Sequence, residues 1–224
     1  MKKLFTVLVI VTSGILSAQN PVEKTIGQFT ELKVFDLIQV KLVKSNDNKV
    51  VISGKNTEDV LVNNKNGKLK IKMNLEKIFN GDGTKVTLYY TSFDILDANE
   101  GATIYSNDNI KQYEIDLKAQ EGGKINVNFD VTYANIKVVT GGIIETSGTA
   151  KNQKVTLLTG GIYKGETVDT EKTEVSINAA GEAYIKASKL ADIKIRAGGD
   201  VFVYGNPETI NESKVLGGRI KRMD

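Results

Sequence analysis

The sequence predicts an all-β protein built around a β-solenoid, and three observations favour this fold. Pairs of glycines recur in the C-terminal half at a nearly constant spacing. The segments before these pairs alternate apolar and polar residues, which is the period of a strand with one buried face. The same residue classes also return at the same position of each copy. Self-similarity at a fixed period is typical of stacked supersecondary units.

The glycine pairs define the repeat. Successive corners lie 19, 19, 20, 18 and 19 residues apart, which predicts about six coils of about 19 residues each. A looser copy begins at Glu100-Gly101. The six regular corners are Gly122-Gly123, Gly141-Gly142, Gly160-Gly161, Ala180-Gly181, Gly198-Gly199 and Gly217-Gly218.

Two strands are expected in each coil, one on either side of the glycines. The strand before them places apolar residues inward in two columns. These are Ile115, Ile136, Val155, Val175 and Ile193, and then Leu117, Val138, Leu157, Ile177 and Ile195. For the strand after the glycines the predicted inward residues are Thr103, Ile125, Ile144, Tyr163, Ala183 and Val201, and then Tyr105, Val127, Thr146, Gly165, Ile185 and Val203.

Parallel coils explain why each column keeps its residue class. In a parallel stack, equivalent residues of successive coils lie about 4.8 Å apart, so Ile packs on Val and Val on Ile. The glycines then form corners, because Gly adopts a positive φ without the cost of a Cβ. The third side of each coil is expected to be short and irregular (FDVTYAN, SGTAKNQ, GETVDTEKT and ASKLA). The alternative is an antiparallel β-sandwich with coincidental glycines.

The two ends of the molecule are expected to differ from its middle. Residues 22–97 alternate well but lack the glycine period, and their turns SNDN, NNKNG and NGDG suit hairpins. We assign 22–97 to an all-β section that caps the first coil, since a solenoid end exposes unpaired strand edges. Residues 98–224 hold the coils, and 22–224 together form one domain. The tail is expected to leave the register after Gly205 and to close the other end.

Residues 1–18 have the pattern of a secretory signal peptide. Lys2 and Lys3 precede an apolar run from Leu4 to Leu16, and Ser17-Ala18 provides a small-residue cleavage site. The alternative is a membrane anchor that is retained. Cleavage after Ala18 removes two of the 30 basic residues and leaves 28 against 27 acidic ones. A nucleic-acid partner is therefore not expected, and nor is a transmembrane segment in the mature chain.

The sequence offers little catalytic chemistry. The absence of Cys and His excludes disulfides, thiol nucleophiles and the commonest general base. An outward column reads Asp116, Lys137, Thr156, Ser176 and Lys194, without the acidic stack that a calcium-dependent lyase needs. Glu145 and Glu166 are out of step and are interpreted as solvated surface. We predict no catalytic, cofactor-binding or metal-binding residue and no enzyme activity.

Two sets of outward residues are candidates for a partner surface. Val139, Leu158, Ile143 and Ile162 flank two successive corners and predict an apolar patch, unless residues 22–97 cover it. Tyr184, Phe202 and Tyr204 fall on outward columns of the last coils, unless the C-terminal tail covers them. Exposed aromatic side chains on a rigid sheet can stack on sugar rings or anchor a protein. The expected partners are glycans or proteins of the envelope or cell surface.

Three parts of the chain resemble a known family. They are FTELKVFDLIQVKLVKSNDNKVVISG with NGKLKIKM near the N-terminus, the glycine-cornered coils, and the closing VYGNPE. This pattern, over about residues 25–220, resembles the head GIN domain family, also called putative auto-transporter adhesin. The resemblance implies a right-handed parallel β-helix without catalytic residues. It also implies export to the envelope of Bacteroidetes-like bacteria and a role in adhesion.

These observations lead to a functional hypothesis with two alternatives. The leading hypothesis is an exported, non-catalytic β-solenoid that binds through its surface, located in the periplasm, on the outer-membrane surface or outside the cell. The first alternative is a polysaccharide-active, pectin-lyase-like enzyme on the same scaffold. The second is a structural envelope protein that associates with itself.

Overall fold

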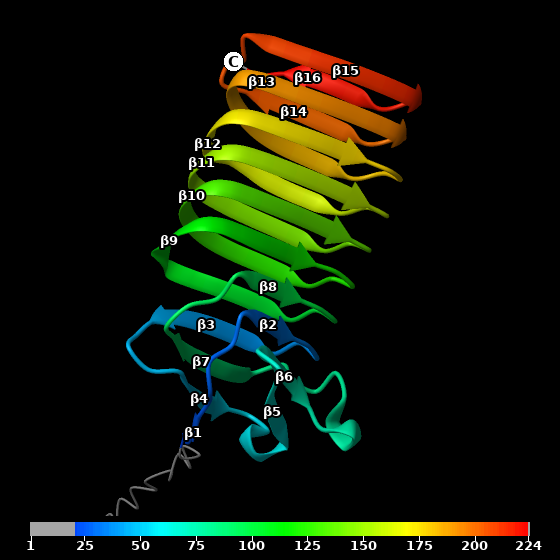
Figure 1. Ribbon diagram of the computed structural model, residues 1–224. Coiled ribbons are helices and arrows are strands. Elements are labelled where there is room, and N and C mark those ends of the chain that lie inside the picture. Colours follow the sequence, from blue (N-terminus) through cyan, green and yellow to red (C-terminus); the bar gives the residue numbers. More distant parts are fainter. Residues whose placement is uncertain (1–20, 224) are drawn as a thin grey trace, which may run out of the picture.

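A computed structural model describes residues 21–223, so the predicted signal peptide, residues 1–18, lies outside the described residues. The chain forms one 16-stranded sheet that winds into a β-solenoid of about seven turns (Figure 1). Two short 3₁₀ helices, η1 (Thr57–Asp59) and η2 (Leu75–Lys77), interrupt the N-terminal strands. The predicted all-β solenoid of about six coils is confirmed.

Five long strands form the regular part of the solenoid, and each pairs in parallel with the next. They are β9 (Thr103–Ala119), β10 (Lys124–Val139), β11 (Ile143–Leu158), β12 (Ile162–Ile177) and β13 (Glu182–Ala197). Parallel pairing rules out the antiparallel sandwich. The prediction of an irregular third side is wrong, because the strands continue through it with only local register shifts. The backbone stays paired with the neighbouring coils although many side chains there are polar.

The corners use glycine for two different physical reasons. At the corner between β10 and β11, Thr140 (φ 47°) and Gly141 (φ 68°) both adopt the left-handed conformation. Gly142 N–H then donates to the carbonyl of Val139 at 3.0 Å and closes the turn. Gly142 itself is needed for space, since a Cβ there would lie 2.5 Å from the carbonyl oxygen of Ala119 in the preceding coil.

The two core columns predicted for the strand before each glycine pair are confirmed from β10 onward. Ile136, Val155, Val175 and Ile193 are successive partners, as are Val138, Leu157, Ile177 and Ile195, and all are buried.

In β9 the predicted columns are wrong. Ile136 lies beside Leu117 rather than Ile115. The inward residues at the start of β9 are Ile104 and Ser106, not Thr103 and Tyr105. Two causes explain these shifts. The first is that Glu100-Gly101 corresponds to Glu121-Gly122 and not to the glycine pair Gly122-Gly123, since these four residues have a positive φ. The second is that β9 carries two extra residues opposite the step from Asn126 to Asn128.

A polar network around Tyr163 lies inside the apolar core. Tyr163 is fully buried, and its hydroxyl lies 2.8 Å from Thr146 Oγ1 and accepts a hydrogen bond from Gln153 Nε2 at 2.7 Å. Burial raises the pKa of Tyr163, so the phenol stays neutral. Gly165 leaves room for the Tyr163 ring, because a Cβ at Gly165 would overlap the phenol.

Parallel coiling extends into the N-terminal section. β2 (Glu31–Val34) pairs in parallel with β6 (Lys68–Met73) and β8 (Ile95–Ala98). β3 (Gln39–Lys44) pairs in parallel with β7 (Thr84–Tyr90) and β9. The corner between β2 and β3 contains Asp36 (φ 59°) and Leu37 (φ 63°), so no glycine pair marks it. A domain boundary near residue 97 stays a prediction.

Of the three predicted hairpin turns, only NNKNG joins two paired strands. NNKNG joins β5 (Val60–Lys65) to β6 in an antiparallel hairpin, which is confirmed. SNDN links β3 to β4 (Lys49–Gly54), but β7 lies between these two strands. NGDG leads from η2 into β7 instead of joining two paired strands. The hairpin predictions for SNDN and NGDG are therefore wrong. The remaining N-terminal strand, β1 (Val22–Thr25), pairs antiparallel with β4.

Ion pairs tie β2 to both of its neighbours. Lys33 Nζ lies 2.7 Å from Oδ2 of the buried Asp97 on β8 and 3.3 Å from Glu31 Oε1. Lys68 on β6 lies 2.8 Å from Glu31 Oε2. Burial alone would raise the pKa of Glu31, but the hydrogen bonds from Lys68 and Lys33 outweigh it and lower that pKa.

The C-terminal tail forms a further coil instead of leaving the register. β14 (Asp200–Tyr204) pairs with β13, then β15 (Thr209–Leu216) pairs with β13 and β16 (Arg219–Arg222) with β14, all in parallel. The prediction that the register ends at Gly205 is therefore wrong. The repeat was hard to recognise because Glu212 and Lys214 occupy the columns of Ile193 and Ile195.

Candidate binding surfaces

The predicted aromatic residues gather on β13 and β14. Tyr184 and Phe202 are partners in adjacent coils, and their rings are stacked with centroids 4.5 Å apart and planes at 11°. Tyr204 lies two residues further along β14, opposite Lys186. All three residues are half-buried. The next neighbour of Phe202 is Lys221 on β16, so the tail extends this column instead of folding over the rings.

The stacked arrangement orients the tyrosine hydroxyl. Tyr184 Oη donates to Glu182 Oε2 at 3.0 Å. Burial, followed by this hydrogen bond, raises the pKa of Tyr184, so the phenol stays neutral at physiological pH. The two rings cover one face of each other, and Lys164 and Lys221 follow them in the same column of the neighbouring coils. The pair therefore offers its ring edges and the tyrosine hydroxyl to a partner.

The predicted apolar patch consists of two pairs. Val139 lies beside Leu158 and Ile143 beside Ile162, and the two pairs stand on opposite sides of the corner. All four side chains are half-buried. The N-terminal strands pair with the solenoid only through β9, so the strand pairing does not place residues 22–97 over this patch.

A second exposed aromatic pair was missed in the sequence. Tyr113 on β9 is 68% exposed and Tyr133 on β10 is 40% exposed. Their ring centroids lie 5.4 Å apart with the planes tilted by 59°. Both stand in the part of the coil that was expected to be irregular, where the chain bends and the alternation changes phase. The only signal was two tyrosines 20 residues apart, close to the repeat period.

A third exposed apolar group lies in the η2 loop. Leu75, Ile78 and Phe79 are 79%, 44% and 57% exposed. Leu75 and Ile78 line a hollow of about 300 Å³ together with Met73 and Lys72. The repeat does not include this loop, so periodicity could not identify it.

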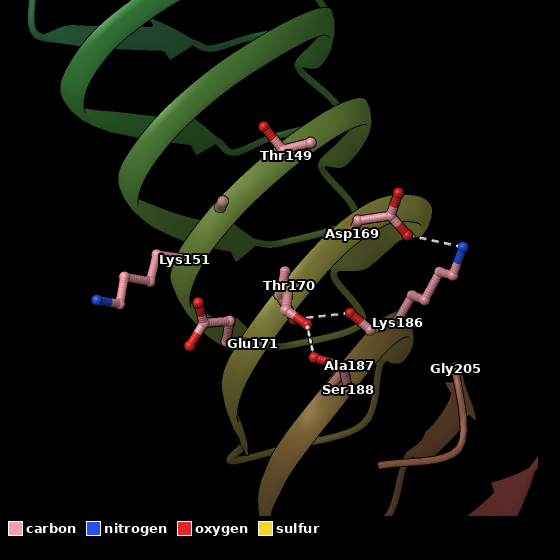
Figure 2. Close-up of a pocket in the computed structure, with 10 residues that line it drawn as sticks. Thr149, Lys151, Asp169, Thr170, Glu171, Lys186, Ala187, Ser188 and Gly205 are labelled. Atoms are coloured by element: carbon pink, nitrogen blue, oxygen red, sulfur yellow. Dashed lines mark hydrogen bonds and ion pairs between the residues drawn. The ribbon is translucent and has the colours of Figure 1, made fainter.

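A groove of about 380 Å³ crosses β11, β12 and β13 at the bend (Figure 2). It arises from unequal coil lengths, since the coil from Ile162 to Glu182 has 20 residues and the next has 18. Between Gly165 and Thr170, β12 therefore has residues that lack a partner in β13. The surface steps inward where the shorter coil follows the longer one.

The carboxylates of the groove are engaged in ion pairs. Asp169 Oδ1 lies 2.7 Å from Lys186 Nζ, and Glu171 Oε2 lies 2.7 Å from Lys189 Nζ. The hydrogen bond from Lys189 lowers the pKa of Glu171. In Figure 2 Asp169 reaches toward Lys186, whereas Glu171 lies on the side of Lys151. A general acid at neutral pH needs the opposite pKa shift, so this arrangement favours polar binding over acid catalysis.

The other acidic residues that the sequence singled out are not brought together as a pair. Glu145 is exposed and lies beside Lys164 rather than Glu166. Glu166 is half-buried, and its Oε2 is enclosed without a hydrogen-bond partner. Residues 21–223 contain no cluster of three or more metal-ligating side chains. Within the same range, no helix has the length and apolar character needed to cross a membrane.

Comparisons with known proteins agree on one fold. The family model "Putative auto-transporter adhesin, head GIN domain" matches residues 28–207. A putative adhesin from Bacteroides fragilis superposes with a TM-score of 0.83 at 16% identity, covering 91% of this chain and 96% of that chain. A putative adhesin from Parabacteroides merdae gives 0.72 at 13% identity, covering 92% and 96%. A putative lipid binding protein from Parabacteroides distasonis gives 0.67 at 17% identity, covering 92% and 98%. No curated protein matches.

Proposed function

Because the chain belongs to the head GIN domain family of putative auto-transporter adhesins, we propose that it is an exported, non-catalytic, adhesin-like protein. It binds its partner through outward side chains of the solenoid. The partners in this proposal are glycans or proteins of the cell envelope or cell surface. Residues 1–18 direct export, and the mature protein acts in the periplasm, on the outer-membrane surface or outside the cell.

The aromatic cluster formed by the stacked pair Tyr184–Phe202 and by Tyr204, two residues further along β14, carries the proposal. Its members come from two adjacent coils whose backbones are joined by a continuous ladder of hydrogen bonds. A fixed backbone and a stacked ring pair lose little conformational freedom on binding, which lowers the entropic cost of association. Tyrosine and other aromatic residues also dominate the binding energy of many interfaces.

The apolar pairs Val139–Leu158 and Ile143–Ile162 are proposed as a second contact. They are half-buried and lie in the middle of the stack. A contiguous patch of apolar side chains on a surface marks an interaction site more often than single exposed apolar residues do. In this proposal a long partner that follows the solenoid axis contacts the apolar patch and the aromatic cluster together.

The first experiment measures binding of a protein that begins at residue 19 to a glycan array and to whole cells. The Tyr184→Ala/Phe202→Ala variant should lose about tenfold or more in affinity. The matched control is Tyr113→Ala/Tyr133→Ala, which removes an exposed ring pair elsewhere on the same solenoid. Circular dichroism should show that both variants fold. Equal binding by the two variants, or no retained ligand together with normal adhesion of a deletion strain, would contradict the proposal.

Export and the absence of catalysis need separate measurements. Deleting residues 1–18 should retain the protein in the cytoplasmic fraction, and an exported truncated protein would overturn this part of the proposal. The ion pairs of Asp169 and Glu171 argue against acid catalysis in the groove. We therefore expect no turnover of uronic-acid polymers with calcium present. Measurable turnover would favour the enzyme alternative.

A further inference from the structure

The last coil presents a free sheet edge. β15 pairs with β13 on one side and has no strand on its other side among residues 21–223 (Figure 1). The carbonyl of Leu216 accepts a hydrogen bond from Gly198 N–H at 2.9 Å and so points back into the stack. Backbone groups alternate along a strand, so those of Asn211, Ser213 and Val215 point to the free edge. Such an edge is a template for pairing with another strand.

The inward side chains of β15 have a symmetric pattern about Ser213, with apolar residues at both ends and two opposite charges between them. The inward residues of β15 are Ile210, Glu212, Lys214 and Leu216, which lie over Ala191, Ile193, Ile195 and Ala197. Ser213 stands at the centre of this series, with one charge of each sign beside it and one apolar residue beyond each charge. Leu216 is 71% exposed, as is its outward neighbour Val215. The lone coil therefore leaves apolar surface in water.

We propose that two copies of this chain pair through β15, antiparallel about a two-fold axis at Ser213. In this register Ser213 lies opposite Ser213 of the second copy, and Glu212 lies opposite the second copy's Lys214. Ile210 lies opposite Leu216 in the same way. Opposite charges in directly opposed positions stabilise a strand pair, and like charges destabilise it. A two-fold interface repeats each contact twice.

The occupant is a second copy because the edge is complementary to itself. Glu212 and Lys214 lie in columns that are apolar in every coil from β10 to β13, so their charges face the end of the core instead of solvent along the side. Their own separation is 4.0 Å, at the limit of an ion pair. The positive charges of β16 would repel those of the second copy and so limit how closely the two ends can approach. Arg219 contributes less to this repulsion because it forms an ion pair with Asp200 at 2.6 Å. This inference does not depend on the proposed adhesive function.

Cysteine crosslinking tests the register, because the natural chain has no Cys. Directly opposed residues in such a pair have Cα atoms about 5.5 Å apart, within disulfide reach. Mild oxidation of Ser213→Cys should therefore give a covalent dimer. The matched control is Asn211→Cys, whose two copies would lie about 14 Å apart, four residues along the strand and one strand across, and should crosslink far more slowly. Equal crosslinking of the two variants would overturn the register.

Charge reversal tests the contact itself, with sedimentation or light scattering as the readout over a range of protein concentrations. Glu212→Lys and Lys214→Glu should each weaken the dimer by about tenfold or more. The double variant carrying both changes should restore it, and so should an equimolar mixture of the two single variants. The substitutions lie at exposed positions, and thermal melts should show intact folding. A monomer that is independent of concentration, or a dimer indifferent to these charges, would overturn the proposal.

Discussion

Leu157→Ala tests the column assignment on which the architecture depends. Leu157 is fully buried and lies between Val138 and Ile177 of the adjacent coils. A Cβ at Gly181 would lie 3.3 Å from Leu157 Cβ, so the side chain is packed from the next corner as well. Truncating a buried leucine costs about 2–5 kcal/mol, and a site that cannot collapse lies in the upper part of this range. Because a hydrogen-bonded ladder holds the coils apart, we expect about 3–4 kcal/mol.

The neighbouring residue provides the control. Leu158 is half-buried and points outward beside Val139, so Leu158→Ala should cost about 1 kcal/mol or less. For about 200 residues the entropy of unfolding is about 0.4 kcal/mol/K. With this entropy, Leu157→Ala should lower Tm by roughly 7–10 °C and Leu158→Ala by about 2.5 °C or less. Urea unfolding followed by circular dichroism gives the free energies, with an unchanged m-value as the check on two-state behaviour. Equal losses at the two positions would refute the assignment.

Three further predictions follow from the corners, the core network and the ion pairs. Gly165→Ala should lower stability by about 1–3 kcal/mol in urea unfolding, because the new Cβ overlaps the hydroxyl of Tyr163; a neutral effect would contradict the packing of that ring. Gly160→Ala meets only the strain of a positive φ and should cost about 1 kcal/mol, whereas Gly161→Ala would place a Cβ 2.7 Å from a backbone oxygen of the preceding coil and should cost more in the same assay. The folded state lowers the pKa of Glu31, so its contribution to stability is present above pH 4.5 and is lost as the pH falls through the folded pKa. Urea unfolding from pH 7 to pH 3 should show a shallower pH dependence for Glu31→Gln, and an identical dependence would exclude this role.

The regular coils could be predicted because two independent signals coincide there. Alternation identifies which residues of a strand face inward, and the glycine corners identify where each coil begins. Val155 and Val175, for example, are 20 residues apart in sequence and are direct neighbours in the stack. A parallel ladder conserves residue class along each column, which is why one sequence suffices to recognise it.

The predictions for the two ends of the solenoid were wrong for identifiable physical reasons. At the N-terminal end Asp36 and Leu37 adopt the left-handed conformation without glycine, so the corner between β2 and β3 has no sequence mark. At the C-terminal end Glu212 and Lys214 occupy core columns, so the alternation of apolar residues disappears although the backbone register continues. Both signals depend on residue type, whereas the ladder depends only on the backbone.

The aromatic pairs show how much of a surface a sequence can reveal. Tyr184 and Phe202 were found because they lie on the regular side of the coil, where alternation assigns them outward. Tyr113 and Tyr133 were missed because they stand at the bend, where the inward and outward positions change phase. A spacing close to the repeat period was present in both cases, and only the backbone geometry shows that both pairs meet.

A partner surface on this fold is therefore built across coils and not along the chain. Inward columns are constrained by packing, but an outward residue contacts mainly its equivalents in the coils above and below. Tyr184 and Phe202 are 18 residues apart and stack, whereas Tyr184 and Ile185 are adjacent in sequence and point to opposite sides of the sheet. Binding specificity can thus change by substitutions that leave the core untouched. The informative unit of mutation is the pair of equivalent residues in adjacent coils, because a single truncation leaves the other ring in place to bind.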